Sequence, residues 1–374
     1  MKSISFFYGW HPTEDVSTPE RDIQAVLEES GPDYDDFSFE RPTAGHQGEV
    51  FLVTLTHRGE DYEVVVKFQT DGDDREAFAI EPYLHEYVAD RTDVPVPRIL
   101  VYKADPELDV PPYFVTERVE GQNLAESLAQ LDSDLRERVV EQAGRILGDM
   151  HAEIAFEGFG RLGLSEGRLV VENLTWDWRG FFEDIVEGYI ENLGQSPFDD
   201  LQETAREYVA DSIEVVPSEG VPRLIHDDFR PANMLFDQAA PEPITAVLDW
   251  QFALAGDPAY HIARTDFLFI DPAFEDAETR RRLRDRLYSG YREYREFEPD
   301  EDYERRRAVY HFATLLWRPS PSSPGSRRHA PRRDSARSST RLPRRCPRPN
   351  PSGPRKPRSP SGRARTGRRP GRCR

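Results

Sequence analysis

Residues 223–237, RLIHDDFRPANMLFD, are the most informative part of the chain. They set Asp228 five residues before Asn233, on a loop between two short apolar runs, and the next apolar run ends in Asp249, 16 residues after Asn233. Such a loop can point all three side chains at one spot. Phosphoryl transfer needs a base for the acceptor hydroxyl and oxygen ligands for magnesium. The spacing therefore predicts a kinase-type catalytic loop at 226–233.

A loop motif with three fixed letters also recurs by chance in a chain of this length. The alternative is a loop in which His226 and Asp227 only cap neighbouring backbone groups. Asp249 favours the catalytic interpretation, because it ends an apolar run where a metal ligand is needed.

The segments LIHDDFRPANMLFD (224–237) and ITAVLDWQFALAGDPAY (244–260) together resemble the catalytic and metal-binding segment of the aminoglycoside phosphotransferase family, which has the protein-kinase-like fold. The resemblance implies that Asp228 is the catalytic base and that Asn233 and Asp249 bind Mg²⁺. It also implies ATP as the phosphate donor, with GTP as a possible substitute.

The chain departs from the family pattern at two positions. Asp227 stands where the family usually has Gly, and His261 stands where it often has Asp. The second change leaves either Asp257 or Asp266 to do the supporting work there. Arg230, two residues after the proposed base, either steadies that base or a phosphate oxygen, or is a surface arginine.

Lys67 ends the apolar run Val64-Val65-Val66, where a kinase-like fold needs a lysine for the α- and β-phosphates. The alternative is a solvent-facing lysine at a strand end. Only three of the 30 basic residues in 1–317 are lysines, so a lysine kept on a buried-looking strand indicates a need for a compact charge. A buried ammonium needs an acidic partner, and the candidates on the following helix are Glu81, which fits best, and then Glu76 and Glu86.

Two further segments are expected to bind the nucleotide. In TAGHQGEV (43–50), Gly45 and Gly48 would let backbone N–H groups approach the phosphates, although a plain hairpin turn explains this stretch nearly as well. By position, Thr116, Glu117 and Val119 are expected to face the adenine. Gly121 is then the hinge.

The periodicity predicts an α+β protein with two lobes. Period-two runs at 50–55 and 62–68, joined by the turn-forming Arg58-Gly59-Glu60-Asp61, predict an antiparallel meander, and 75–91 predicts a helix despite Pro82. After Asn123 most segments have apolar residues three and four apart, which is typical of helices. We expect a small β-rich lobe at 1–118 with a leading helix and a lobe-bridging helix, and a larger helical lobe at 119–317.

Charge separates the last part of the chain from the rest. Residues 318–374 contain 18 Arg, one Lys and one Asp; removing them from the totals of 49 basic and 69 acidic residues leaves 30 and 68 in residues 1–317, a formal net charge of −38. Abundant acid with scarce lysine resembles proteins of salt-accumulating organisms, and we expect a halophilic archaeon as the source. No apolar run is long enough to span a membrane and no signal peptide is visible, so we expect a cytoplasmic protein.

The basic tail, residues 318–374, is expected to be disordered, because it has almost no large apolar residue. It begins inside the apolar helix ATLLW and contains both cysteines, Cys346 and Cys373. We interpret it as a high-GC gene read in a shifted frame. If the tail is genuine, the alternative is a nucleic-acid-binding arm.

The remaining features have structural interpretations. His151 is expected to be a packing residue, and the aromatic cluster Trp176, Trp178, Phe181 and Phe182 is expected to be core. The acids Glu183, Asp184, Glu187 and Glu191 could meet a cationic substrate, but a solvated face is the stronger interpretation.

The sequence predicts an ATP- and Mg²⁺-dependent phosphotransferase acting on a hydroxyl of a small molecule. A catalytically idle nucleotide-binding module is the alternative, against which the complete set of base, metal ligands and lysine argues. Within the family the acceptors include aminoglycosides, other antibiotics, choline-like alcohols, sugars and amino-acid alcohols, and the chain carries no readable code that chooses among them. We expect a monomer or a weak dimer.

Overall fold

The computed structural model describes residues 19–31, 33–42, 49–70, 74–107 and 109–317. The predicted phosphate loop with Gly45 and Gly48 lies outside these residues, as do the basic tail and both cysteines. All described residues belong to one contact unit, residues 1–330. No helix among them is both long enough and apolar enough to cross a membrane.

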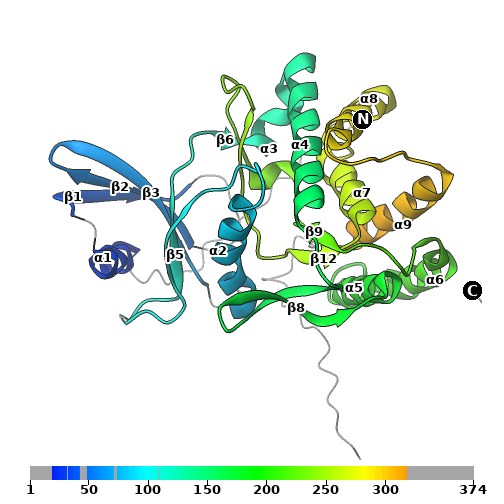
Figure 1. Ribbon diagram of the computed structural model, residues 1–374, viewed down its shortest axis with the longest axis horizontal. Helices are drawn as coiled ribbons and strands as arrows, with labels where there is room; N and C mark the ends of the chain where they lie inside the picture. The colour runs from blue at the N-terminus through cyan, green and yellow to red at the C-terminus, as the bar shows by residue number, and fades with distance from the viewer. Residues whose placement is uncertain (1–18, 32, 43–48, 71–73, 108, 318–374) are drawn as a thin grey trace, which may run out of the picture. The chain divides into compact units, whose positions relative to one another are not determined.

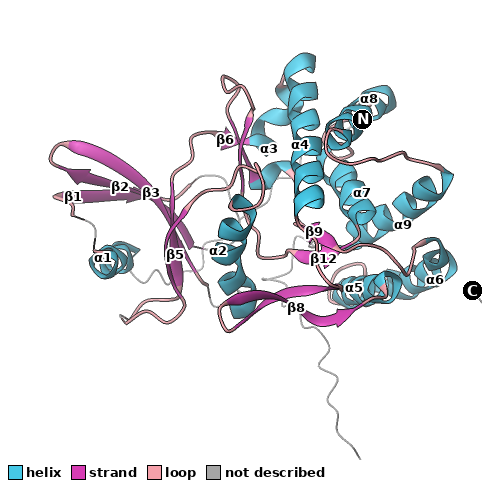
Figure 2. Cartoon of the chain, viewed as in Figure 1, coloured by secondary structure: helices cyan, strands magenta, loops and turns pink. Residues whose placement is uncertain are grey.

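A five-stranded antiparallel sheet forms the first part of the chain, in the order β1-β2-β3-β5-β4 (Figure 2). Its strands are β1 (Asp36–Glu40), β2 (Glu49–His57), β3 (Glu60–Phe68), β4 (Ile99–Lys103) and β5 (Tyr113–Glu117). The β2–β3 turn has Arg58 and Gly59 at φ 54° and 83°, the left-handed pair that suits a two-residue hairpin. The predicted meander is therefore confirmed.

Two helices accompany this sheet. Helix α1 (Pro19–Ser30) contributes Ile23, Val26 and Leu27 to the core beside it. Helix α2 (Arg75–Ala89) begins at Asp74, whose side chain accepts hydrogen bonds from the Glu76 and Ala77 N–H groups. An interior proline such as Pro82 costs a helix about 3 kcal/mol, and the burial of α2's apolar side offsets that cost.

The apolar side of α2 packs into the core of the second part of the chain. Ile80, Leu84 and Val88 belong to the same cluster of buried residues as Leu147 and Val247. Helix α2 therefore has contacts with both the sheet and the helical part.

Helices dominate the second part (Figure 1). They are α3 (Leu124–Ser127), α4 (Ser133–Glu153), α5 (Trp178–Leu193), α6 (Gln202–Ser212), α7 (Pro258–Phe269), α8 (Ala277–Arg292) and α9 (Glu301–Trp317). Short strands between them are β6 (Gln122–Asn123), β9 (Arg223–Ile225), β10 (Met234–Phe236), β11 (Ile244–Val247) and β12 (Leu254–Gly256). The catalytic-loop sequence lies between β9 and β10, and Asp249 lies between β11 and β12.

One hairpin was not predicted. Strands β7 (Phe159–Ser165) and β8 (Arg168–Thr175) pair antiparallel, and they join β12 and β9 in a four-stranded sheet. Their turn has Glu166 and Gly167 at φ 51° and 70°, again a left-handed pair. Glu-Gly between two alternating runs was the signal for this hairpin in the sequence.

Helices α4 and α8 pack closely because glycine stands at their contact. A Cβ at Gly144 would lie 2.0 Å from the Leu287 carbonyl oxygen, and one at Gly290 would lie 1.9 Å from the Glu141 carbonyl oxygen. Any larger residue must push the two helices apart.

Candidate active site

Lys67 lies on β3 with its ammonium between two carboxylates. Its Nζ is 2.7 Å from Glu81 Oε2 and 3.4 Å from Asp249 Oδ1, and the Lys67 side chain is only 12% exposed. Burial opposes the charged ammonium, but the carboxylates of Glu81 and Asp249 outweigh it and raise the pKa of Lys67. The lysine is therefore permanently charged.

Glu81 is the acid that reaches this lysine. It lies on the buried side of α2, whereas Glu76 and Glu86 are exposed to solvent. His85, one turn further along α2, places Nε2 at 3.9 Å from the other Glu81 oxygen. Burial lowers the pKa of His85 to about 4, so this neighbour is neutral at pH 7.

Asp249 follows β11 directly and has a left-handed backbone, with φ 65°. Its Oδ1 accepts a hydrogen bond of 2.9 Å from Gln251 Nε2. The strand before it is fixed from α4, where Gln142 donates to the Ile244 carbonyl and accepts from the Ile244 N–H, at 2.9 Å and 2.7 Å. A buried glutamine with both ends paired holds the strand that carries Asp249.

Asp228 and Asn233 meet at the ends of the predicted loop. The Asn233 amide donates from Nδ2 to the Asp228 carbonyl oxygen and to Asp228 Oδ2, both at 2.9 Å. The Leu248 N–H donates to the Asn233 carbonyl at 2.9 Å, which ties the loop to the residue before Asp249. Asp228, Asn233 and Asp249 thus lie in one region.

His226 fixes the start of the loop. Its ring accepts a hydrogen bond from the Asp228 N–H at Nδ1 (3.3 Å) and donates from Nε2 to the Leu248 carbonyl (3.0 Å). Burial lowers the pKa of His226 to about 4, which agrees with this neutral tautomer. His226 therefore contributes more than a local cap.

Asp228 is buried, with 1% of its surface exposed. Burial and the nearby Asp249 carboxylate raise its pKa to about 6, although Arg230 and Arg264 work in the opposite direction. Arg230 Nε lies 2.9 Å from Asp228 Oδ1, and the Arg230 side chain is 35% exposed. Arg230 is therefore placed to steady Asp228, and its guanidinium carbon also lies 5.6 Å from the centre of the Trp317 ring.

Asp227 also has a left-handed backbone, with φ 60°. Tyr260, on α7, donates from its hydroxyl to Asp227 Oδ1 at 2.7 Å. Arg264, one turn further along α7, donates from Nε to the Asp227 carbonyl at 2.6 Å and lies 3.2 Å from Oδ1. Neither partner was among the residues singled out in the sequence.

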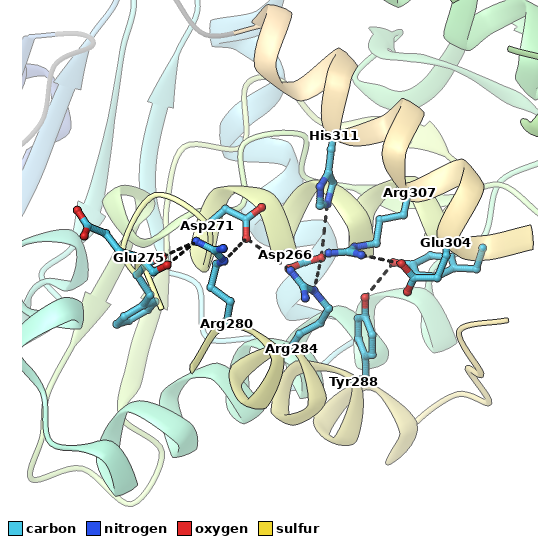
Figure 3. Close-up of polar contacts among 11 residues, drawn as sticks. Asp266, Asp271, Glu275, Arg280, Arg284, Tyr288, Glu304, Arg307 and His311 are labelled. Carbon is cyan, nitrogen blue, oxygen red and sulfur yellow. Dashed lines mark hydrogen bonds and ion pairs between the residues drawn. The ribbon is translucent and has the colours of Figure 1, made fainter. Parts of the chain in front are cut away.

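The two acids expected to support the loop do other work. Asp257 caps the start of α7 by accepting from the Ala259 N–H at 2.6 Å. Asp266 lies among cations of the neighbouring helices (Figure 3): Arg284 Nε at 2.7 Å, Arg307 Nε at 2.6 Å and His311 Nε2 at 3.4 Å. We find the contacts from α7 to the loop in Tyr260 and Arg264 instead.

The expected adenine segment ends β5. Thr116 is buried, and the Glu117 carboxylate accepts from the Arg98 N–H at 3.1 Å, so it faces β4. Val119 is half-buried in the segment that leaves the sheet. Gly121 has φ 143°, and a Cβ there would lie 2.9 Å from Thr245 Oγ1, so the proposed hinge has no room for a side chain.

The structural interpretations hold with one exception. His151 is fully buried and contacts Tyr291 and His261, as expected of a packing residue. In the aromatic cluster, Trp178 and Phe182 are core, but Trp176 is 75% exposed, so its assignment to the core was wrong. Trp176 lies between β8 and α5, outside the regular elements that bury its neighbours. The acids expected to line a solvated face are exposed or half-buried on α5: Glu183, Asp184, Glu187 and Glu191.

Asn233 and Asp249 can supply a divalent cation with an amide oxygen and carboxylate oxygens. Because Asn233 Nδ2 is engaged with Asp228, Oδ1 is the atom left for a ligand. Mg²⁺ prefers such oxygens and is ordinarily held by one or two protein side chains together with substrate phosphates and water. Among the described residues no three His, Cys, Asp or Glu side chains are grouped so that they could hold a metal ion.

Comparisons with known proteins identify a family and several structures of similar fold. The model of the phosphotransferase enzyme family matches residues 38–297. Solved structures with a similar fold include the GDP and kanamycin complex of APH(2")-IIia, at 16% identity over 79% of this chain and 89% of that one, with a TM-score of 0.53. The streptomycin–ATP complex of APH(2")-IIa is 14% identical over 79% and 88%, with a TM-score of 0.51.

A third relative, the ADP-bound aminoglycoside phosphotransferase APH(2'')-Ib, is 14% identical over 80% of this chain and 91% of its own, with a TM-score of 0.51. No curated protein sequence matches the chain. The structural likeness confirms the predicted two-lobed, protein-kinase-like fold, with a small antiparallel sheet and a larger helical part.

Proposed function

The chain belongs to the phosphotransferase enzyme family, and on that premise we propose that it transfers the γ-phosphoryl group of ATP to a hydroxyl of a small molecule, with Mg²⁺. The observation that carries the proposal is the convergence of Lys67, Glu81 and Asp249 with the Asp228–Asn233 loop. These residues come from both parts of the chain and meet through the Lys67–Glu81, Lys67–Asp249 and Asn233–Asp228 contacts.

Asp228 is proposed as the base. As the acceptor oxygen attacks the γ-phosphorus, the bond from that phosphorus to the β–γ bridging oxygen breaks and ADP leaves. The hydroxyl proton passes to the Asp228 carboxylate, of which Oδ2 is held by Asn233. A pKa of about 6 keeps Asp228 mostly ionised at pH 7 and close to the pH at which a base is effective.

Arg230 is proposed to assist this step. Its Nε lies beside Asp228 Oδ1, and the partly exposed guanidinium is proposed to meet a phosphoryl oxygen as well. A guanidinium with several donors suits both tasks at once.

Asn233 and Asp249 are proposed to hold Mg²⁺, which when bound neutralises charge on the β- and γ-phosphates. Lys67 is proposed to hold the α- and β-phosphates, with Glu81 fixing its ammonium.

The backbone at Thr116, Glu117 and Val119 is proposed to meet the base of the nucleotide. That Gly45 and Gly48 bind the phosphates stays a prediction from the sequence, because both residues lie outside the described ones. ATP is the proposed phosphate donor, and GTP is the alternative donor.

The acceptor is proposed to be a small hydroxyl compound. The solved relatives include one complex with kanamycin and one with streptomycin. At identities of 14% and 16% those ligands belong to the relatives alone. The aminoglycosides therefore enter the test as one class among several.

The experiment is an acceptor screen with the full-length protein. Aminoglycosides, choline-like alcohols, sugars and amino-acid alcohols are incubated with ATP or GTP and Mg²⁺ at low and high KCl, and products are detected by mass spectrometry as a gain of one phosphoryl group. We expect one class to be phosphorylated and EDTA to stop the reaction. Tight ATP binding without transfer to any acceptor or to water would favour the idle nucleotide-binding module.

A further inference from the structure

We propose that Arg264 is a positioning residue for the catalytic loop, because it holds Asp227, the neighbour of the proposed base, in a left-handed backbone conformation. The inference rests on the proposed function, since it explains how Asp228 is kept in place. It also explains how an Asp can occupy position 227, where the backbone has a positive φ: the contacts with Arg264 stabilise that conformation.

The backbone at Asp227 requires outside support. A φ of 60° is unfavourable for any residue with a Cβ, although Asp tolerates it better than most. Two side chains from α7 supply contacts: the Tyr260 hydroxyl to Asp227 Oδ1, and Arg264 Nε to the Asp227 carbonyl and to Oδ1. Tyr260 and Arg264 are four residues apart, so they share one face of the helix.

Arg264 holds the main chain as well as the side chain. Its hydrogen bond of 2.6 Å goes to the carbonyl of the peptide that joins Asp227 to Asp228. The orientation of that peptide determines where the Asp228 carboxylate points. A misplacement of about 1 Å at a reacting group can cost about 100-fold in rate, so the contact is suited to positioning the base.

The pair is shielded from water. Asp227 and Arg264 are each 1% exposed, and Tyr260 is fully buried. The Arg264 guanidinium also lies 4.5 Å from the ring of Trp317, the last residue of α9. Water cannot easily replace Arg264 in such a site, so its loss leaves the Asp227 carboxylate without a charged partner.

Helix α7 is itself anchored on its other side. Asp266 follows Arg264 by two residues, and at 3.6 residues per turn it points away from the loop. There it accepts Arg284 from α8 and Arg307 from α9 (Figure 3). One face of α7 is thus clamped to α8 and α9, while the other face presents Tyr260 and Arg264 to the loop.

A buried ion pair that only stabilises the fold is the competing explanation. It predicts that variants lose thermal stability but that each folded molecule keeps its rate. Positioning predicts a loss of rate at the loop with nucleotide binding preserved, because Lys67 and Glu81 lie on other elements.

The test compares full-length Arg264→Met, Arg264→Lys and the double variant Asp227→Gly/Arg264→Met. Arg284→Met is the matched control, since it too removes an arginine that is paired with a buried carboxylate, here Asp266 at 2.7 Å, but one that does not contact the loop. In the double variant Gly accepts the positive φ and no charge is left unpaired, so folding is expected to recover. Four quantities are measured: the melting temperature, the ATP affinity, kcat, and hydrogen exchange of the peptide 226–234.

We expect Arg264→Met to lower kcat about 100-fold while ATP affinity changes by no more than about twofold, and we expect faster exchange at 226–234. Arg264→Lys should recover part of the rate. The double variant should recover melting temperature but not kcat. Arg284→Met should lower melting temperature alone.

Wild-type kcat and wild-type loop exchange in the folded double variant would overturn the proposal. If the wild-type protein transfers phosphate neither to an acceptor nor to water, the proposed function fails instead. Loop exchange in the same variants still decides whether Arg264 positions the loop.

Discussion

The Lys67 ammonium lies 3.4 Å from Asp249 Oδ1, although 182 residues separate the two in the chain. Lys67 belongs to the five-stranded sheet, and Asp249 follows a strand of the helical part. Glu81 completes the arrangement at 2.7 Å from the same ammonium. One lysine therefore links both parts of the chain at the place where we propose that the phosphates bind.

Replacing Lys67 with Ala should weaken ATP binding and slow turnover together. A hydrogen bond to a charged group contributes about 1.5 to 3 kcal/mol, which corresponds to roughly 10- to 100-fold in affinity. Lys67→Arg should not restore the loss, because the planar guanidinium does not fit between Glu81 and Asp249 as a compact ammonium does. Isothermal titration with ATP and Mg²⁺ measures the effect.

Lys103→Ala is the control, because this lysine pairs with Glu29 at 3.3 Å, away from the site. Its ATP affinity should equal that of the wild type. Equal ATP affinity in Lys67→Ala and Lys103→Ala would remove Lys67 from the nucleotide site.

Asp266 should make stability depend on pH in the acid range. Burial opposes its ionisation, but His311, Arg284 and Arg307 prevail and lower its pKa to about 2, from an ordinary value of 3.8. A folded pKa below the unfolded one stabilises the protein above about pH 4 and loses that effect as the pH falls towards 2. The difference corresponds to roughly 2 to 3 kcal/mol at neutral pH.

Asp266→Asn should therefore lower the free energy of unfolding at pH 7 by about 3 to 5 kcal/mol, since it strands two arginines. Urea unfolding should show this difference shrinking between pH 4 and pH 2. Glu278→Gln, at an exposed acid on α8, should show neither effect. A pH-independent difference for Asp266→Asn would mean that the ion pairs are not its cause.

Gly144→Ala should separate helices α4 and α8. The new Cβ would start 2.0 Å from the Leu287 carbonyl oxygen, which belongs to rigid helix backbone. Overpacking of this kind costs about 1 to 3 kcal/mol. Gly188→Ala, on α5, is the matched control, because nothing lies within 4 Å of its Cβ.

The control should raise stability by up to about 1 kcal/mol, the ordinary preference of a helix for Ala over Gly. Melting temperatures of the two variants should thus move in opposite directions. A Gly144→Ala protein as stable as the wild type would show that the helices can yield at this contact.

Salt should stabilise the protein. With a formal net charge of −38 in residues 1–317, the folded chain repels itself, and the Debye length falls from about 10 Å at 0.1 M salt to about 3 Å at 1 M. We expect the melting temperature to rise steadily with KCl. Sucrose at matched osmolality separates charge screening from general exclusion of solutes, and an equal rise in sucrose would contradict the electrostatic explanation.

The spacing of apolar residues along the chain predicted individual strands and helices. The alternation in β2 and β3 and the helix through Pro82 are visible as residue periodicity. The β7–β8 hairpin was missed, although its turn glycine and alternating residues were present. Trp176 was assigned to the core because its neighbours in the sequence are aromatic. In the structure it lies in the connection between β8 and α5 and is exposed, whereas Trp178 is buried in α5.

The contact between Lys67 and Glu81 could be predicted because the residue types themselves suggested it. Lys67 stood out by composition, and Glu81 by its place on the next helix, and the two lie in contact. Their roles, like those of Asp228, Asn233 and Asp249, stay predictions until they are tested. Arg264 and Tyr260 could not be found in this way, because Asp227's positive φ creates the need for them and no residue pattern states a backbone angle.

Asp228→Asn tests the central claim most directly. The amide keeps the shape and the contact with Asn233 but cannot accept the acceptor's proton at neutral pH. With the acceptor from the screen, we predict ATP affinity within about twofold of the wild type and kcat lower by about 100- to 10,000-fold. Wild-type kcat in a folded Asp228→Asn protein would contradict the assignment of Asp228 as the base.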